Sequence, residues 1–146
     1  MDDDCDKDSR TRLRTPLLAV DLVIERDGAI VLIRRENPPY EGCYALPGGF
    51  VEVGERVEDA AVREAWEETG LSVTLKRMIG IYSDPGRDPR GHVVSICFLA
   101  CGEGSLRAGT DAREAAWFSN QSLPALAFDH ALMIEDCLKN RTISLM

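Results

Sequence analysis

The sequence predicts an α/β fold in which a mixed β-sheet lies between helices. Segments with the composition of β-strands are interspersed with helical segments, without the regular strand–helix–strand alternation of a parallel sheet. The chain has 146 residues, of which 45% are hydrophobic, and this suits a single domain with a sizeable core. We expect that domain to span residues 15–140.

The first half of the domain begins with a predicted hairpin. Residues 17–25 and 29–35 are rich in aliphatic and β-branched residues, and an Asp-Gly pair between them favours a tight turn. The prolines of residues 37–42 indicate a loop. A short strand is expected at residues 44–46, leading to a pair of glycines.

The second half begins with a helix rich in glutamate that ends near Gly70. Three apolar segments then predict strands, at residues 72–82, 92–101 and 115–118. Residues 83–91 are too polar and too rich in turn residues to belong to the core. An apolar stripe at helical spacing predicts a second helix over residues 129–138.

The two ends of the chain differ in composition from the domain. Residues 1–14 have almost no apolar content after the first residue and predict a disordered leader, and residues 141–146 are expected to form a C-terminal tail. An acidic N-terminus is unlike a secretory signal, and no run of 18 apolar residues is present. Five cysteines without a CxxC pair predict reduced thiols. We therefore expect a cytoplasmic protein that has no membrane partner.

The net charge of −8 argues against a nucleic-acid partner, because duplex binding relies on basic side chains that displace counterions. A phosphate ligand bridged by a metal ion is compatible with this charge.

Three glutamates crowd one face of the first predicted helix. Glu64, Glu67 and Glu68 stand at positions i, i+3 and i+4, so their side chains share an arc of about 100°. Two unit charges about 4 Å apart repel by about 4 kcal/mol at an effective dielectric constant of about 20. A solvated acidic face is the ordinary explanation, but a hard divalent cation also removes the repulsion. Val62 and Trp66 fall nearly opposite Glu64 and are expected to pack into the core.

The residues around the glutamates have physical roles of their own. Gly48 and Gly49 permit positive φ and a close backbone approach, so that a carbonyl group can face a metal ion. Arg63 lies four residues before Glu67 and is positioned to orient that carboxylate. Glu55 suits the positive end of the helix dipole.

Gly49 is followed after five residues by Glu55 and after seven more by the run Arg63-Glu64-Ala65-Trp66-Glu67-Glu68-Thr69-Gly70-Leu71. This pattern resembles the signature of the Nudix hydrolases. Ala65 stands where that family often has a larger aliphatic residue. The resemblance covers residues 16–139 and implies an α/β/α sandwich around a mixed sheet. It also implies hydrolysis of a nucleoside diphosphate linked to another moiety, with Mg²⁺, or alternatively Mn²⁺, as the cofactor.

By position in this motif, the resemblance implies that the metal ligands are Glu64, Glu67, Glu68 and the carbonyl group of Gly48. It gives supporting roles to Gly49, Glu55 and Gly70, and an orienting role to Arg63. The general base differs among subfamilies, so a helix glutamate, Asp111 and Glu114 remain candidates. Asp111 is equally suited to bond its own turn.

Substrate preference must come from residues outside the motif. The segments 37–40, 82–92 and 127–130 resemble short archaeal and bacterial ADP-ribose pyrophosphatases. The implied substrate-binding residues are Arg34, Tyr40, Pro85, Arg87, Arg90, Phe128 and Asp129.

Several of these residues have alternative roles. Arg34 and Arg35 point to opposite faces of a strand, so at most one faces the site, and we favour Arg34. Asp129 only accepts hydrogen bonds, which suits the exocyclic amine of adenine, but it is also placed to cap the second helix. Phe128 is suited to stack on adenine or to pack in the core.

We therefore expect hydrolysis of ADP-ribose to AMP and ribose 5-phosphate, in a homodimer like those of related enzymes. The alternatives are hydrolysis of an oxidised or non-standard nucleoside triphosphate, and a non-catalytic domain that senses ADP-ribose.

Overall fold

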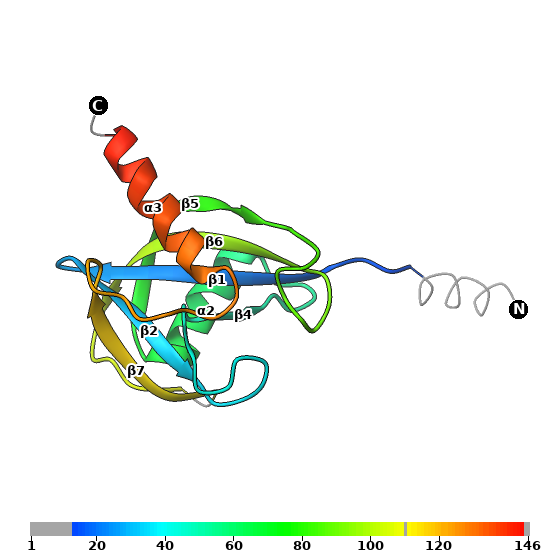
Figure 1. The fold of residues 1–146 in the computed structure, drawn as a ribbon, viewed down its shortest axis with the longest axis horizontal. Helices are drawn as coiled ribbons and strands as arrows, with labels where there is room; N and C mark the ends of the chain where they lie inside the picture. Colours follow the sequence, from blue (N-terminus) through cyan, green and yellow to red (C-terminus); the bar gives the residue numbers. More distant parts are fainter. Residues whose placement is uncertain (1–12, 110, 145–146) are drawn as a thin grey trace, which may run out of the picture.

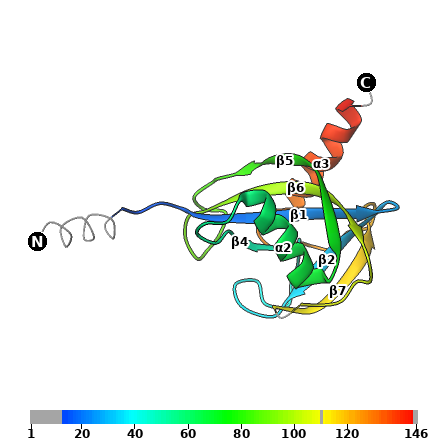
Figure 2. The same cartoon turned by 180° about the vertical axis from the view of Figure 1, so that it is seen from behind.

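The computed structural model describes residues 13–109 and 111–144. Residues 1–12 of the predicted leader and the last residues of the predicted tail lie outside the described residues. The described part confirms the predicted α/β/α arrangement, because the helices α2 (Val57–Thr69) and α3 (His130–Ser144) cover opposite faces of one sheet (Figures 1 and 2). Within the described ranges, no helix is long and apolar enough to cross a membrane.

The strands, in chain order, are β1 (Leu17–Arg26), β2 (Ala29–Arg35), β3 (Tyr44–Ala45), β4 (Gly48–Phe50), β5 (Ser72–Tyr82), β6 (Val93–Glu103) and β7 (Ala112–Ser119). The sheet has the order β3-β2-β1-β6-β5, with β4 also paired to β1 and β7 to β2. β1 and β6 run parallel over nine residue pairs, from Leu17↔Val93 to Glu25↔Cys101, while the other pairings are antiparallel. The sheet is therefore mixed, as predicted.

The core lies on both faces of β1, because alternate residues of a strand point to opposite sides. One hydrophobic cluster joins Val20 and Leu22 to three alanines of α2. The other joins Val23 to Met133 and Ile134 of α3. These clusters hold the two helices against the sheet. The end of β4 and the start of α3 border a cavity.

Several element boundaries differ from those predicted. β7 is eight residues long, whereas only residues 115–118 were expected. α3 continues to Ser144, so the helix extends into the predicted tail 141–146. β4 replaces what was expected to be a loop, because Gly48, Gly49 and Phe50 pair with β1.

The orientation of α2 also differs from the expectation. Trp66 is 53% exposed and Val62 is also exposed, so the prediction that both are core residues is wrong. The buried face carries Ala60, Ala61 and Ala65 together with Glu64 and Glu68. Small alanines bring the helix close to the sheet, and the two glutamates are thereby turned inward.

Candidate active site

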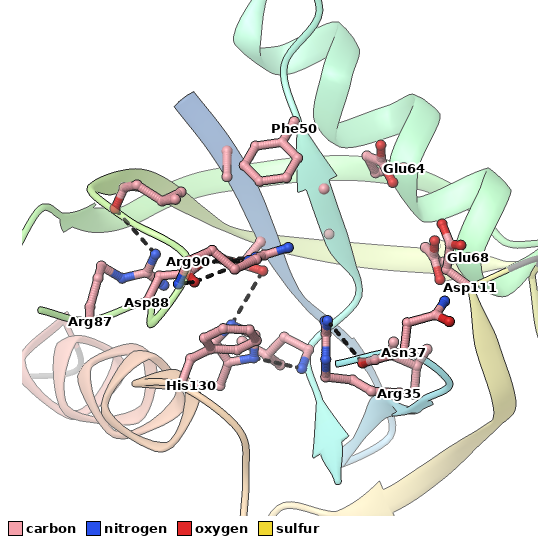
Figure 3. Close-up of a pocket in the computed structure, with 18 of the residues that line it drawn as sticks. Arg35, Asn37, Phe50, Glu64, Glu68, Arg87, Asp88, Arg90, Asp111 and His130 are labelled. Atoms are coloured by element: carbon pink, nitrogen blue, oxygen red, sulfur yellow. Dashed lines mark hydrogen bonds and ion pairs between the residues drawn. The ribbon is translucent and has the colours of Figure 1, made fainter. Parts of the chain in front are cut away.

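A cavity of about 450 Å³ opens between β4, α2, the loop between β5 and β6, and the start of α3 (Figure 3). One end is acidic and is lined by Glu64, Glu68 and Asp111. The other end, called the mixed end below, is lined by charged and aromatic side chains. These are Arg87, Asp88, Arg90, Phe128 and His130. Its volume falls within the range of small-molecule sites.

The acidic end holds carboxylates that are poorly hydrated. Glu64 is 8% exposed and Glu68 is 5% exposed. Burial, together with the nearby negative charges of Asp111 and Glu64, raises the pKa of Glu68 to about 7. Burial also raises the pKa of Glu64, against the opposing effect of Arg63. The repulsion expected from the sequence is therefore present in the fold.

Arg63 connects Glu64 to two further glutamates, Glu55 and Glu67. Its Nε lies 2.7 Å from Glu55 Oε2, and its Nη1 lies 2.8 Å from Glu64 Oε1 and 3.1 Å from Glu67 Oε2. The hydrogen bond from Arg63 is the main reason that the pKa of Glu55 falls to about 2. The pair with Glu67 was expected from the spacing, whereas the contacts with Glu55 and Glu64 extend that expectation.

The predicted metal ligands are not assembled around a common point. In the described part of the chain, no three acidic, histidine or cysteine side chains form a group that could hold a metal ion. Arg63 binds Glu64 and Glu67, and the side chain of Glu67 is half-exposed. However, Oε2 of Glu68 is buried without a hydrogen-bond partner among the described residues. An unpartnered carboxylate oxygen beside further acids fits a hard divalent cation, which takes oxygen ligands.

The two glycines of β4 allow close approaches, of Gly48 to β1 and of Gly49 to Glu64 of α2. They have the extended conformation of a strand, so neither uses the positive φ that glycine permits. The predicted close approach is confirmed: a Cβ atom on Gly48 would lie 2.2 Å from the carbonyl oxygen of Val20, and one on Gly49 would lie 2.4 Å from Cδ of Glu64. Gly70 ends the helix in the predicted left-handed conformation, with φ of 72°.

Arg35, not Arg34, faces the cavity. Arg34 donates to the carbonyl oxygen of Gly42 at 3.0 Å and lies outside the lining, so the preference for Arg34 is wrong. Arg35 shares the cavity lining with Ile33, two residues earlier on the same face of β2. The alternation of a strand predicts that only one arginine faces the site, but it does not say which one.

Arg87 and Asp129 form an ion pair. Arg87 Nη2 lies 2.7 Å from Asp129 Oδ1, and Arg87 Nε lies 2.9 Å from Asp129 Oδ2. Each carboxylate oxygen accepts one hydrogen bond from Arg87, and the contact of Asp129 with adenine remains a prediction. Asp129 precedes the first residue of α3, but among the described residues its backbone carbonyl, and not its side chain, accepts from the N–H groups of Leu132 and Met133, so the predicted side-chain cap is wrong. Arg87 lines the cavity with its guanidinium already paired, so a direct substrate contact is not supported.

Tyr40 and Pro85 do not line the cavity, unlike Arg90 and Phe128. The ring of Tyr40 instead lies 4.7 Å from that of Phe128, measured between centroids. Pro85 is exposed in the loop between β5 and β6. Proximity in sequence to a site loop does not determine which of its side chains turns inward.

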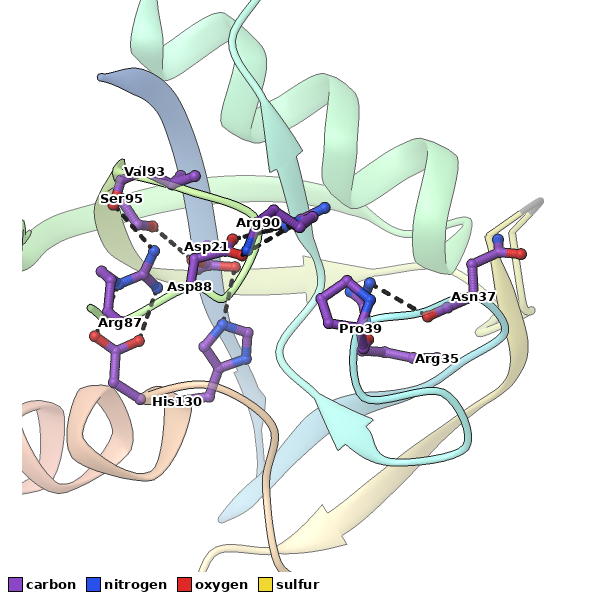
Figure 4. Close-up of polar contacts among 11 residues, drawn as sticks. Asp21, Arg35, Asn37, Pro39, Arg87, Asp88, Arg90, Val93, Ser95 and His130 are labelled. Atoms are coloured by element: carbon purple, nitrogen blue, oxygen red, sulfur yellow. Dashed lines mark hydrogen bonds and ion pairs between the residues drawn. The ribbon is translucent and has the colours of Figure 1, made fainter. Parts of the chain in front are cut away.

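A buried polar group under the cavity was missed by the sequence analysis (Figure 4). Ser95 Oγ donates to Asp21 Oδ2 at 2.5 Å, and His130 Nε2 lies 3.4 Å from Asp21 Oδ1. The backbone N–H of Leu46 donates to His130 Nδ1 at 3.0 Å, which leaves the proton of a neutral ring on Nε2, facing Asp21. The available signal was a lone acidic residue, Asp21, within the apolar segment of β1.

Comparison with known proteins identifies the family to which the chain is similar. The family model described as the NUDIX domain matches residues 15–137. An ADP-ribose pyrophosphatase of Methanocaldococcus jannaschii is 56% identical over 125 residues, which are 85% of this chain and 74% of that protein. A putative 8-oxo-dGTP diphosphatase of Bacillus subtilis is 34% identical over 103 residues, which are 70% of this chain and 66% of that protein.

Two solved structures have a similar fold. The NUDIX domain of Shewanella oneidensis NrtR complexed with ADP ribose gives a TM-score of 0.77 at 26% identity, covering 89% of this chain and 91% of that one. A MutT/nudix family protein from Enterococcus faecalis gives 0.78 at 31% identity, covering 99% of this chain and 70% of that one.

Proposed function

Because this chain belongs to the Nudix family of hydrolases, we propose that it cleaves ADP-ribose to AMP and ribose 5-phosphate with the help of Mg²⁺ or Mn²⁺. The observation that carries the proposal is the buried oxygen of Glu68 at the acidic end of the cavity, which has no hydrogen-bond partner among the described residues. It lies in the family motif, on the helix face that the fold turns inward. The 56% identity to an ADP-ribose pyrophosphatase supports this choice of substrate.

The residues of the acidic end have distinct parts in this proposal. Glu68, with Glu64 and Glu67, would hold the cation, and the carbonyl group of Gly48 would supply a further oxygen. When bound, a divalent cation neutralises charge on a diphosphate and lowers the pKa of a coordinated water, so that hydroxide is available near neutral pH. Arg63 orients Glu64 and Glu67 through its ion pairs, and Glu55 holds Arg63 from the other side.

The base that takes the proton from the attacking water has two candidates on the loop before β7 and at its start. Asp111 lines the cavity beside Glu68. Glu114 instead accepts a hydrogen bond from the hydroxyl group of Tyr44 and lies outside the lining. We therefore assign the role to Asp111, with Glu68 as the helix candidate.

The other end of the cavity supplies groups for the diphosphate and its substituents. Arg35 and Arg90 both line it, and a guanidinium forms paired hydrogen bonds with phosphate oxygens. Arg35 takes the place of Arg34 in this proposal.

A substrate panel tests the proposal against its main alternative, which the Bacillus subtilis relative represents. Purified protein is incubated with Mg²⁺, and separately with Mn²⁺, and with either ADP-ribose or 8-oxo-dGTP. The expected products are AMP and ribose 5-phosphate in equal amounts, formed faster than pyrophosphate from the triphosphate. Release of pyrophosphate from 8-oxo-dGTP without AMP from ADP-ribose would reject the proposal. Binding of ADP-ribose without turnover of either compound would favour the sensor alternative.

The predicted homodimer remains a prediction. Sedimentation analysis of the full chain should give about twice the chain mass of 16.1 kDa, and a single species at the monomer mass would contradict it.

A further inference from the structure

Three side chains from distant parts of the sequence meet at the mixed end of the cavity. Phe50 ends β4, Arg90 lies in the loop between β5 and β6, and Phe128 precedes α3. The Cζ atom of Arg90 lies 5.2 Å from the ring centroid of Phe50 and 5.6 Å from that of Phe128. The guanidinium is thus in contact range of both aromatic rings, and all three residues line the cavity. Figure 3 labels Phe50 and Arg90.

We propose that Phe50 and Phe128 are the two aromatic walls of a slot for the base of the nucleotide, which the guanidinium of Arg90 occupies in this structure. The proposal rests on the proposed function and extends it by naming the residues that recognise the base. Stacking on adenine was one of the two roles considered for Phe128, but Phe50 and the position of Arg90 were not anticipated.

The chemistry of the slot suits a nucleobase. A guanidinium is flat, delocalised and stacks on aromatic faces, so Arg90 marks a position that another flat π-system would also occupy. Every nucleobase has such a face, and stacking on aromatic side chains is a common way to bind one. An aliphatic ligand would gain no such contact.

The exposure of Phe50 and Arg90 separates these two side chains from the core. Phe50 is 38% exposed, and the side chain of Arg90 is 44% exposed. Neither residue belongs to the buried hydrophobic clusters among the described residues. An aromatic ring left this open at a cavity is therefore better explained by a ligand than by packing.

Arg90 is held in the slot from one side. Its Nη2 lies 2.7 Å from Oδ2 of the buried Asp88, and its backbone N–H also donates to Asp88 Oδ1 at 2.9 Å. Phe50, Arg90 and Val93 line a second cavity of about 520 Å³ as well as the first. Arg90 is thus part of the partition between the two cavities, and its movement would enlarge the slot.

Phe128 has an unfavourable backbone conformation. Phe128 has φ of 52° and Tyr40 has φ of 57°, a left-handed conformation that is unusual for bulky residues. Their rings contact each other at 4.7 Å between centroids. Such conformations persist where the surroundings enforce them and are concentrated at ligand sites. Tyr40 therefore has a positioning role, supporting the ring of Phe128 from outside the cavity.

The slot is connected to the acidic end of the cavity through Phe50. Phe50 immediately follows Gly48 and Gly49, which approach Val20 and Glu64 closely. Its carbonyl oxygen accepts a hydrogen bond from Arg63 Nη2 at 3.1 Å. A diphosphate at the acidic carboxylates would accordingly place its attached nucleoside within reach of Phe50.

Calorimetric binding of AMP and of ribose 5-phosphate to the full chain tests the slot without relying on turnover. Phe50→Ala should weaken AMP binding about tenfold, since loss of one stacking partner typically has an effect of this size. It should leave ribose 5-phosphate binding within about twofold of the wild type, because that product has no base. Phe50→Trp should retain AMP binding. In turnover, Phe50→Ala should raise KM for ADP-ribose by a similar factor and change kcat less.

Val53→Ala is the matched control, because Val53 is fully exposed three residues further along and lines neither cavity. It should bind both products as the wild type does. Circular dichroism melting of each variant establishes that the fold is intact. Unchanged AMP binding in Phe50→Ala, an equal loss for both products, or no AMP binding by the wild type would overturn the slot.

The slot and the proposed function fail in different ways. If the wild type does not hydrolyse ADP-ribose but AMP binding depends on Phe50, the proposed substrate is wrong and the slot stands. If ADP-ribose is hydrolysed and AMP binding does not depend on Phe50, the slot is wrong and the proposed function stands.

Discussion

Glu68 shows how the proposed site conflicts with stability at the scale of a single residue. Its side chain is buried, one carboxylate oxygen has no partner among the described residues, and Asp111 and Glu64 lie close enough to raise its pKa. Such a group is costly to ionise in a folded protein. A role in holding a cation accounts for the presence of a carboxylate where an uncharged residue would be more stable.

Glu68→Gln should abolish ADP-ribose turnover and yet stabilise the metal-free protein at high pH. The pKa of Glu68 is raised from 4.5 to about 7, so folding favours the protonated acid. The resulting loss of folding free energy is absent below pH 4.5, grows as the pH rises, and is complete above pH 7. One pKa unit corresponds to about 1.4 kcal/mol, and with solvent screening at the open cavity we expect a gain of about 1 to 2 kcal/mol.

Thermal melting in EDTA at pH 8 and at pH 4.5 measures this effect. The Tm of Glu68→Gln should exceed that of the wild type at pH 8 and equal it at pH 4.5. A lower Tm for the variant at both pH values would show that the carboxylate contributes to the fold itself.

At the scale of elements, β4 determines where α2 can place its carboxylates. A Cβ atom on Gly49 would overlap the carboxyl group of Glu64, whereas one on Gly109 would lie 1.9 Å from the backbone oxygen of Glu67. The first overlap involves the end of a flexible side chain, and the second involves the helix backbone. Gly49 thus affects the position of a predicted ligand more than it affects the fold.

Gly49→Ala should therefore lower kcat/KM for ADP-ribose about 10- to 100-fold, as displacement of groups that support metal ligands does. Its Tm should change by only a few degrees. Gly80→Ala is the matched control, since its nearest contact beyond the chain neighbours is at 3.4 Å, an ordinary distance. Wild-type activity in Gly49→Ala would show that Glu64 does not need its present position.

The sequence predicted those elements that local patterns determine. Apolar runs located the long strands, and the glycine at position 70 located the end of α2. β4 was missed because glycines have low strand propensity, and its pairing with β1 joins segments about 30 residues apart. The buried face of α2 was misjudged because large apolar residues were expected inside, whereas three alanines and two glutamates fill that face. Arg35 and Phe50 could not be placed without knowing which side of each strand borders the cavity.

At the scale of the whole molecule, the pair Arg87–Asp129 joins the loop between β5 and β6 to the start of α3. The side chain of Arg87 is only 4% exposed, and the loop carries Asp88 and Arg90 into the cavity. The mixed end of the cavity therefore depends on contact between segments 42 residues apart.

Arg87→Ala should destabilise the protein by about 2 to 4 kcal/mol, because it leaves the carboxylate of Asp129 without its partner. It should also raise KM more than it lowers kcat, since the loop is displaced while the acidic end is retained. Arg113→Ala removes an exposed pair, 3.7 Å from Glu41, and should cost less than about 1 kcal/mol. Urea unfolding measures the free energy of unfolding of the two variants. Equal values would contradict the stabilising role of the Arg87–Asp129 ion pair.

The central claim is that the inward acidic face of α2 cleaves ADP-ribose with a divalent cation. The most direct measurement is the rate of AMP release from ADP-ribose by EDTA-treated protein before and after Mg²⁺ is added, with Glu68→Gln measured in parallel. The predicted result is no AMP before addition, one AMP for each ribose 5-phosphate afterwards, and no restored activity in the variant. Equal rates before and after Mg²⁺, or wild-type activity in Glu68→Gln, would contradict the claim.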